Sequence, residues 1–294
     1  WVTEYDFDGF RHDATKHVPN NFWRDLTRKL KARSSSTNEP MLYQIGETYG
    51  TPELIASYLG SGLLDAQFDF NLYDAMVASL AGKLSMKRLR SEIERSLKYY
   101  GAHHLMGNIT GNQDRARFIS FAAGDLSLNE DSKYAGWNRN IGIKDPIKAY
   151  QKQALLFGLI STLPGIPVIF YGDEIGIPGG NDPDNRKMMK FTDWNEHEEK
   201  LLTQTRKLLN FRRNSMPLNY GNTSIVLADE DILIYKRKYL DNSVLIVINN
   251  GEIPIRNLGV RGEYKKTLMG HDRPYFAKQQ MINLPPNSFE IYYN

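Results

Sequence analysis

Short apolar runs alternate with longer segments of helical periodicity over the first two thirds of the chain. Strands are predicted where residues 7–17 begin and at 41–47, 65–70, 103–108 and 166–171. Helices are predicted between them, at 20–32, 54–59, 72–80, 84–99 and 146–163. This alternation indicates parallel βαβ units, with functional groups at the carboxyl ends of the strands. The last strand is so apolar that we expect both of its faces to be covered.

The pattern changes after Arg213. Short strand-like runs follow at 225–227, 232–238, 244–248, 264–268, 281–284 and 289–293, separated by clusters of Gly, Asn, Asp and Pro. The sequence therefore predicts an α/β domain at 1–213 and a small antiparallel β-sandwich at 214–294. Stabilising the first domain is the expected role of the second. Within the first domain, a polar loop is predicted at 34–40.

Composition is that of an ordinary soluble globular chain, with 294 residues, 41% hydrophobic and 24% charged. The net charge of +3 is too small to indicate a nucleic-acid or membrane partner. Aromatic residues make up 12%, and exposed aromatic faces are surfaces on which sugars stack. Zero cysteines exclude disulfides, thiolate metal sites and a Cys nucleophile. The lack of cysteine does not identify the cellular compartment, and we favour a periplasmic or extracellular location over a cytoplasmic one.

Carboxylates follow three of the predicted strands, and the first has a partner. Arg11 and Asp13 are two residues apart, so in an extended chain both project to the same face, where the guanidinium keeps the carboxylate ionised. For an isolated pair, a structural ion pair closing a strand end is the commoner interpretation. Glu47 and Asp114 recur at later strand ends, and this repetition favours a catalytic site.

Four stretches together resemble the short sequence regions of the α-amylase family of glycoside hydrolases, and they occur in the family's order. They read GFRHDATKH, IGET, GNQD and PGIPVIFYGDEIGIPGGNDPDNRKMM. The resemblance implies a (β/α)8 TIM barrel followed by an all-β domain. It also implies an α-glucan substrate, no required cofactor, and a structural calcium whose ligands would lie largely outside this chain.

The same resemblance implies roles for individual residues. Asp13 matches the catalytic nucleophile, Glu47 the general acid/base and Asp114 the carboxylate that stabilises the transition state. The implied substrate-binding residues are Arg11, which orients the nucleophile, Lys16 and His17 on the leaving-group side, Gln113 beside the third carboxylate, and Asp182 and Arg186 on the other side.

Chemistry independently requires such a set. A retaining glycosidase needs one ionised carboxylate to attack the anomeric carbon and one protonated carboxyl group to release the leaving oxygen. Asp13 beside Arg11 is biased toward the ionised form. Glu47 follows Ile45 and Gly46, a less polar setting that raises a carboxyl pKa, and negative charge on Asp13 acts in the same direction.

Two positions depart from the family pattern. Gln113 replaces a histidine before the third carboxylate, and an amide can still donate a hydrogen bond but cannot become cationic. His12 occupies a place that is usually apolar, and on a strand it should face away from Asp13 toward the helix layer as a packed histidine. The family's first region has no counterpart in the chain, and we count only the last five of eight barrel strands, about strands 4–8.

Two other functions compete with an α-glucan hydrolase. One is a non-catalytic glucan-binding piece, which would have no reason to retain Asp13, Glu47 and Asp114 together. The other is a metal-dependent hydrolase using a set of five residues, namely His12, Asp13, His17, His103 and His104. His103 and His104 are adjacent and would point to opposite faces of a strand, which makes one shared metal awkward.

The missing strands have a consequence for partners. A sheet of five barrel strands exposes two edges and the apolar side chains that should meet the other three. We expect the chain either to associate with a missing N-terminal portion of the same enzyme or to self-associate, and to be weak or inactive alone.

Overall fold

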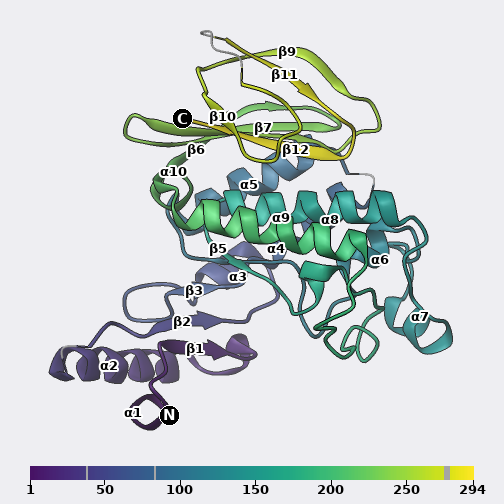
Figure 1. The fold of residues 1–294 in the computed structure, drawn as a ribbon. Coiled ribbons are helices and arrows are strands. Elements are labelled where there is room, and N and C mark those ends of the chain that lie inside the picture. Colours follow the sequence, from purple (N-terminus) through teal and green to yellow (C-terminus); the bar gives the residue numbers. More distant parts are fainter. Residues whose placement is uncertain (38, 83, 275–278) are drawn as a thin grey trace.

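Five short parallel strands form the sheet of the first region in the computed structural model, which describes residues 1–37, 39–82, 84–274 and 279–294 (Figure 1). They are β1 Gly9–His12, β2 Tyr43–Gly46, β3 Ala66–Gln67, β4 Gly107–Ile109 and β5 Ile166–Val168. β1, β2 and β3 pair in that order, and β4 pairs with β5. A parallel bridge between Phe68 and Gly107 joins the two groups, so the strands lie side by side in sequence order.

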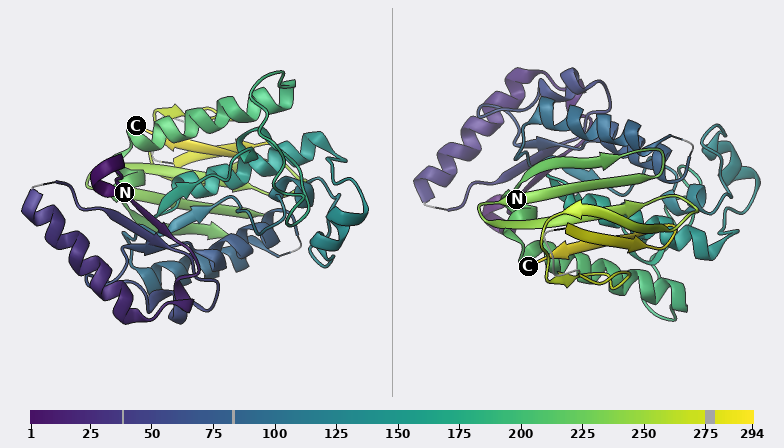
Figure 2. Two further views of the ribbon diagram at one scale, coloured as in Figure 1. Left: turned by 90° about the horizontal axis from the view of Figure 1, so that it is seen from below. Right: turned by 90° about the horizontal axis from the view of Figure 1, so that it is seen from above.

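Helices lie between the strands, and each of the five helices predicted for the first region overlaps one of these. The longer ones are α2 Asn20–Thr37, α4 Phe70–Leu80, α5 Met86–Tyr100, α8 Pro146–Thr162 and α9 Glu196–Arg213. The shorter ones are α1 Val2–Tyr5, α3 Pro52–Ala56, α6 Phe118–Ala122, α7 Ser132–Asn138 and α10 Met216–Tyr220, together with the 3₁₀ turns η1 Thr15–His17 and η2 Asp173–Ile175. Figure 2 shows α2 along one outer margin of the molecule and α7 at the opposite end.

The predicted loop at 34–40 is wrong over its first four residues, because α2 continues through Thr37. The Ser36 and Thr37 hydroxyls donate to the carbonyl of Arg33, at 2.8 and 3.0 Å. Such bonds to the preceding turn let hydroxyl residues remain in a helix. Asn38, within the same predicted loop, lies outside the described residues.

The main core lies where α8 meets both halves of the structure. Thirteen of its residues are buried, including Leu155, Leu156 and Phe157 at 0% exposure. Figure 1 shows α8 and α9 side by side between the parallel strands and the antiparallel sheets. A helix that is apolar nearly all round must be covered on every side, and here the antiparallel sheet covers it on one of them, with Phe289 in the same cluster.

The second region forms two facing antiparallel sheets. One has the order β10-β12-β8-β7-β6 and the other pairs β11 with β9. Their strands are β6 Asn222–Ala228, β7 Ile232–Tyr239, β8 Asn242–Asn249, β9 Ile255–Arg261, β10 Lys266–Thr267, β11 Gln279–Leu284 and β12 Ser288–Tyr293. A separate apolar cluster, with Ile234, Val247 and Ile282 at 0% exposure, fills the space between the sheets. The predicted sandwich is therefore present, although β9 and α10 were not predicted.

The two regions are closely joined. α8 contacts β12, and α5 contacts β6 and β7. The ammonium of Lys152 on α8 also donates to the backbone carbonyl of Asn250 at 2.7 Å. Lys152 is 5% exposed, and its burial lowers its pKa to about 8. The boundary at residue 213 stays a prediction.

Three strand predictions need correction. The strand predicted at 65–70 is only Ala66–Gln67, since Phe70 already begins α4. β5 is half-buried throughout, as are Ile169 and Phe170 after it, whereas both faces were expected to be covered. Within the described part of the sheet, β5 pairs with β4 along one edge only. Its other edge is open, so solvent reaches the side chains from there. The strand predicted at 103–108 begins only at Gly107, so His103 and His104 lie in the turn before it.

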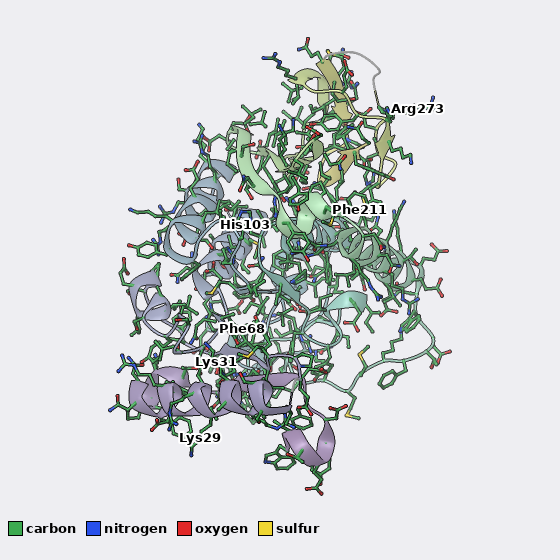
Figure 3. The ribbon with its side chains drawn as sticks, turned by 90° about the vertical axis from the view of Figure 1, so that its left-hand side faces the viewer. Lys29, Lys31, Phe68, His103, Phe211 and Arg273 are labelled. Atoms are coloured by element: carbon green, nitrogen blue, oxygen red, sulfur yellow. The ribbon has the colours of Figure 1, made fainter. Side chains whose placement is uncertain are left out.

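Phe68, between β3 and α4, packs against the main core from the sheet. Figure 3 shows this ring inside the molecule, between the layer of α2 and the helices above it. Lys29 projects from the outer side of α2 in the same view. Among the described residues, no helix has the length and apolar character needed to cross a membrane.

Candidate active site

An acidic residue follows each of the five parallel strands, and burial divides these residues into two classes. They are Asp13, Glu47, Asp69, Asp114 and Asp173. Asp69 is 1% exposed and caps the first turn of α4, while Asp173 is 2% exposed within a buried ion pair. The side chains of the other three are 73%, 16% and 56% exposed in sequence order. Only these three among the five remain accessible to a ligand at the strand ends.

Arg11 lies between the first two carboxylates and contacts both. Its Nη1 bonds Oδ1 of Asp13, and its Nη2 lies 2.8 Å from Oε2 of Glu47. The Arg11 contact holds the pKa of Asp13 below its ordinary value, first by hydrogen bonding and then by charge. The alternation of side chains along β1 places both residues on one face, as the sequence predicts.

The pKa of Glu47 is displaced in the opposite direction to that of Asp13. Burial raises its pKa above the ordinary value, and hydrogen bonding and charge from Asp13 act the same way, while Arg11 and the Ala14 amide oppose the rise. The two carboxyl groups therefore influence each other, and their pKa values move apart. One group is biased toward the ionised form and its neighbour toward the protonated form.

The backbone at Glu47 is fixed by the loop that follows β1. Its amide donates to the carbonyl of His12 at 2.9 Å and to Oγ1 of Thr15 at 3.0 Å, and its carbonyl accepts from the Thr15 amide at 2.8 Å. Gly46 makes this approach feasible, since a Cβ there would lie 2.5 Å from Thr15 Oγ1 and 2.5 Å from Gln67 Nε2. The second carboxylate is thus placed by rigid backbone contacts.

Asp114 belongs to a second group, formed by the loops after β4 and β5. Its Oδ1 lies 3.2 Å from Nη2 of Arg186, its Oδ2 accepts from Nε2 of Gln113 at 2.9 Å, and its amide donates to Asn112 at 3.0 Å. Arg186 also pairs with Asp182 at 3.1 Å. The predicted residues Gln113, Asp114, Asp182 and Arg186 therefore form one cluster.

The remaining predicted substrate residues, Lys16 and His17, lie in η1 beside Asp13. The Lys16 ammonium donates to the carbonyl of Tyr49 at 2.9 Å, and both side chains are exposed. No hydrogen bond or ion pair within the described ranges joins this side of the site to Asp114. The two groups stand at the ends of β2 and β4, which are two strand spacings apart, roughly 10 Å.

His12 faces the helix layer, as predicted. Its ring lies 4.9 Å from that of Trp23 on α2, its Nε2 is 3.1 Å from Oε1 of Gln44, and burial lowers its pKa. His104 lies in the turn before β4, where burial first and the charge of Arg237 second lower its pKa to about 4. In the part of the chain that the structure describes, no three His, Cys, Asp or Glu side chains are grouped to hold a metal ion.

Aromatic and cationic residues behind the site were not predicted. The Arg115 guanidinium lies over the rings of Tyr49 and Tyr73, 5.2 and 5.6 Å from their centroids, and it pairs with Asp74. The Tyr49 hydroxyl donates to the same carboxylate at 3.1 Å. Tyr49 lies two residues after Glu47, which is a usable sequence signal, but the partners on α4 become neighbours only in the fold.

Comparison with known proteins gives a consistent result. The model of the alpha amylase catalytic domain matches residues 1–216. A cyclomaltodextrinase of Geobacillus thermopakistaniensis is 27% identical over 99% of this chain, and a maltogenic alpha-amylase of Bacillus acidopullulyticus is 26% identical over 99%. The alignment covers 46% of each relative, so the chain spans about half the length of these curated relatives.

Solved structures agree with the sequence comparison. An Anoxybacillus alpha-amylase superimposes with a TM-score of 0.80 at 26% identity, covering 100% of this chain and 60% of its own. A Geobacillus thermoleovorans alpha-amylase, complexed with acarbose, gives 0.80 at 26% identity and covers 61% of its own chain. The predicted resemblance is therefore confirmed, and the chain belongs to the alpha-amylase family.

Proposed function

We propose that this chain carries the catalytic carboxylates of a retaining hydrolase of α-glucosidic bonds in starch-type glucans or maltooligosaccharides. Asp13 attacks the anomeric carbon to form a covalent glycosyl ester, while Glu47 gives its proton to the departing glycosidic oxygen. Glu47 then takes a proton from water, which attacks the ester and releases Asp13. These two displacements preserve the anomeric configuration.

The observation that carries this proposal is the pair bridged by Arg11. Retention requires carboxyl groups about 5–5.5 Å apart, whereas inversion requires roughly 6.5–9.5 Å to admit a water molecule. One guanidinium contacts both groups here, which holds them near each other and favours the shorter separation. The lowered pKa of Asp13 suits a nucleophile, and the raised pKa of Glu47 suits an acid.

The second cluster would bind the sugar from the other side. In this proposal Asp114 accepts hydroxyl hydrogen bonds that strengthen in the transition state, and Gln113 donates to a neighbouring hydroxyl. The next sugar unit is bound by Asp182 and Arg186. The leaving group is bound by Lys16 and His17. Their partial exposure supports these roles, since substrate can reach them. All the chemistry is performed by side chains, so the proposal requires no cofactor.

We further propose that β1 to β5 are about strands 4–8 of an eight-stranded barrel, completed by a further segment of the same protein. The five parallel strands in sequence order support this, as does the share of the alpha-amylase structures that this chain leaves uncovered. We call the chain together with that segment the complete enzyme.

Kinetics of Asp13→Asn and Glu47→Gln in the complete enzyme test these roles. Both substitutions keep the side-chain shape but remove the nucleophile or the transferable proton, so we expect kcat on maltooligosaccharides to fall about 10³-fold or more. Binding of substrate, measured by calorimetry, should remain within a few-fold. Turnover near the parent value in either variant would refute the assignment, and binding without turnover in the parent would favour the non-catalytic glucan-binding alternative.

A further inference from the structure

The loop that carries Asp114 is held by one buried amide. Asn185 is 0% exposed, and its Nδ2 lies 3.2, 2.9 and 2.8 Å from the backbone carbonyls of Asn112, Gln113 and Arg115. Those carbonyls lie on both sides of Asp114. Because the donor is a short and fully packed side chain, it fixes the path of the backbone through the third carboxylate.

The backbone of Asn185 is itself held from beneath. Nε of Arg117, a residue 1% exposed, donates to the carbonyl of Asn185 at 2.9 Å. Nη1 of the same guanidinium donates to the carbonyl of Tyr171 at 2.6 Å and to Oδ1 of Asp173 at 2.8 Å. The hydroxyl of Thr110, directly after β4, donates to the other oxygen of Asp173 at 2.6 Å. The chain of contacts therefore runs from β4 to Asn185 through buried groups.

Arg186 adds a contact from the same loop. Its Nε donates to the carbonyl of Gln113 at 3.1 Å while its Nη2 reaches the Asp114 carboxylate. Arg186 is half-exposed and belongs to the proposed sugar-binding cluster, whereas Asn185 has no exposed surface with which to touch substrate. The two neighbouring residues thus have separable tasks.

We propose that Asn185 is a positioning residue for Asp114, acting on the reaction only through the backbone it holds. The inference rests on the proposed function, in which Asp114 stabilises the transition state. Removing the amide takes a hydrogen-bond donor from three backbone carbonyls and releases the loop. A displacement of about 1 Å at a catalytic group can cost about 10²-fold in rate.

A double-mutant cycle in the complete enzyme separates positioning from a purely structural role. We expect Asn185→Ala to lower kcat about 10–100-fold, with KM changed less than about three-fold. In an Asp114→Asn background, the same substitution should give no further loss, since the group it positions is gone. Asn185→Ser keeps one donor and should give an intermediate kcat, which serves as a second variant if alanine impairs folding.

Asn108→Ala is the matched control. Asn108 on β4 is 1% exposed and donates to the carbonyl of Pro164 at 2.7 Å, away from the carboxylates. The Asn108→Ala variant should have a lower melting temperature but a kcat close to that of the parent enzyme. Additive losses in the cycle, or an equal loss of kcat in Asn108→Ala, would overturn the proposal.

Hydrogen exchange tests the clamp, meaning the three contacts from Asn185 to the loop of Asp114, without relying on activity. The Asp114 and Arg115 amides bond within the same loop, to Asn112. They should exchange about tenfold faster in Asn185→Ala and at the parent rate in Asn108→Ala. Unchanged exchange would refute the clamp. Faster exchange in a protein whose parent form cleaves no glucan would instead refute the proposed function and keep the clamp.

Discussion

Asp13 and Glu47 share one guanidinium yet have pKa values displaced in opposite directions, because their exposure differs. Asp13 lies in solvent, where the Arg11 contact is the main influence on its pKa. Glu47 is mostly buried, so desolvation is the first cause of its raised pKa and the attraction of Arg11 reduces the rise. The proposed division of roles between the carboxylates thus follows from where each one lies at its strand end.

Arg11→Gln should shift both limbs of the pH profile to higher pH. The Arg11 charge lowers the pKa of Asp13 and also lowers that of Glu47, so its removal raises both. In the proposed mechanism, kcat/KM falls at low pH as Asp13 gains a proton and at high pH as Glu47 loses one. Both midpoints of kcat/KM against pH in the complete enzyme should therefore shift to higher pH.

Arg24→Gln, an exposed arginine on α2, provides the control and should leave both limbs unchanged. Midpoints that stay in place in Arg11→Gln, or that move in opposite directions, would contradict the account of the pair.

The residues found from the sequence are those whose signal is local. Arg11 and Asp13 share a face because they are two apart on a strand, and Glu47 follows a short apolar run that ends at Gly46. Asn185 carries no such signal, because an asparagine in a Gly- and Pro-rich segment looks like any loop residue. Its function depends on carbonyls about 70 residues away, which only the fold brings to it.

At the scale of elements, the alternation of strands and helices was predicted correctly, and its exact limits were not. α2 runs into the predicted loop because hydroxyl side chains bond to the turn before them. α9 was not predicted, although Asn195 and Glu198 form a capping box at its start, since only Leu201, Thr205 and Leu208 along its polar surface are buried. The apolar composition of β5 indicates contact on both faces, but the sheet supplies a neighbour on one side.

The open side of β1 leads to a prediction about association. Trp1, Tyr5 and Phe7 beside this edge are 77%, 55% and 41% exposed and form ring contacts with one another at 5.4–6.2 Å. An unpaired strand edge next to exposed aromatic side chains favours pairing with another chain. Purified alone, the chain should sediment above its 33.8 kDa and cleave soluble starch weakly or not at all.

Phe7→Lys should reduce that association, because charge at an edge opposes pairing. The matched control is Ile253→Lys, because Ile253 is 78% exposed but lies in the second region. This substitution should leave the association unchanged. A stable monomer with full activity would show that neither the edge nor a further segment matters.

The chain contains the three accessible carboxylates, but it spans only about half the length of its curated relatives. The second region and α8 enclose a continuous core, so this part of the protein has an extensive interior of its own. The accessible carboxylates lie on the other side, at the strand ends, where 73% of the Asp13 side chain is exposed. The proposed further segment would narrow this site around the substrate and strengthen the electrostatic interactions within it.

The proposed mechanism requires Asp13 to form a covalent bond to the sugar. The most direct measurement is mass spectrometry of the complete enzyme after incubation with a fluorinated α-maltosyl fluoride, which slows hydrolysis of the intermediate. We expect one added glycosyl mass, located by peptide mapping at Asp13 and absent from Asp13→Asn. An adduct on Glu47 or Asp114, or turnover of this reagent with no adduct at any carboxylate, would contradict it.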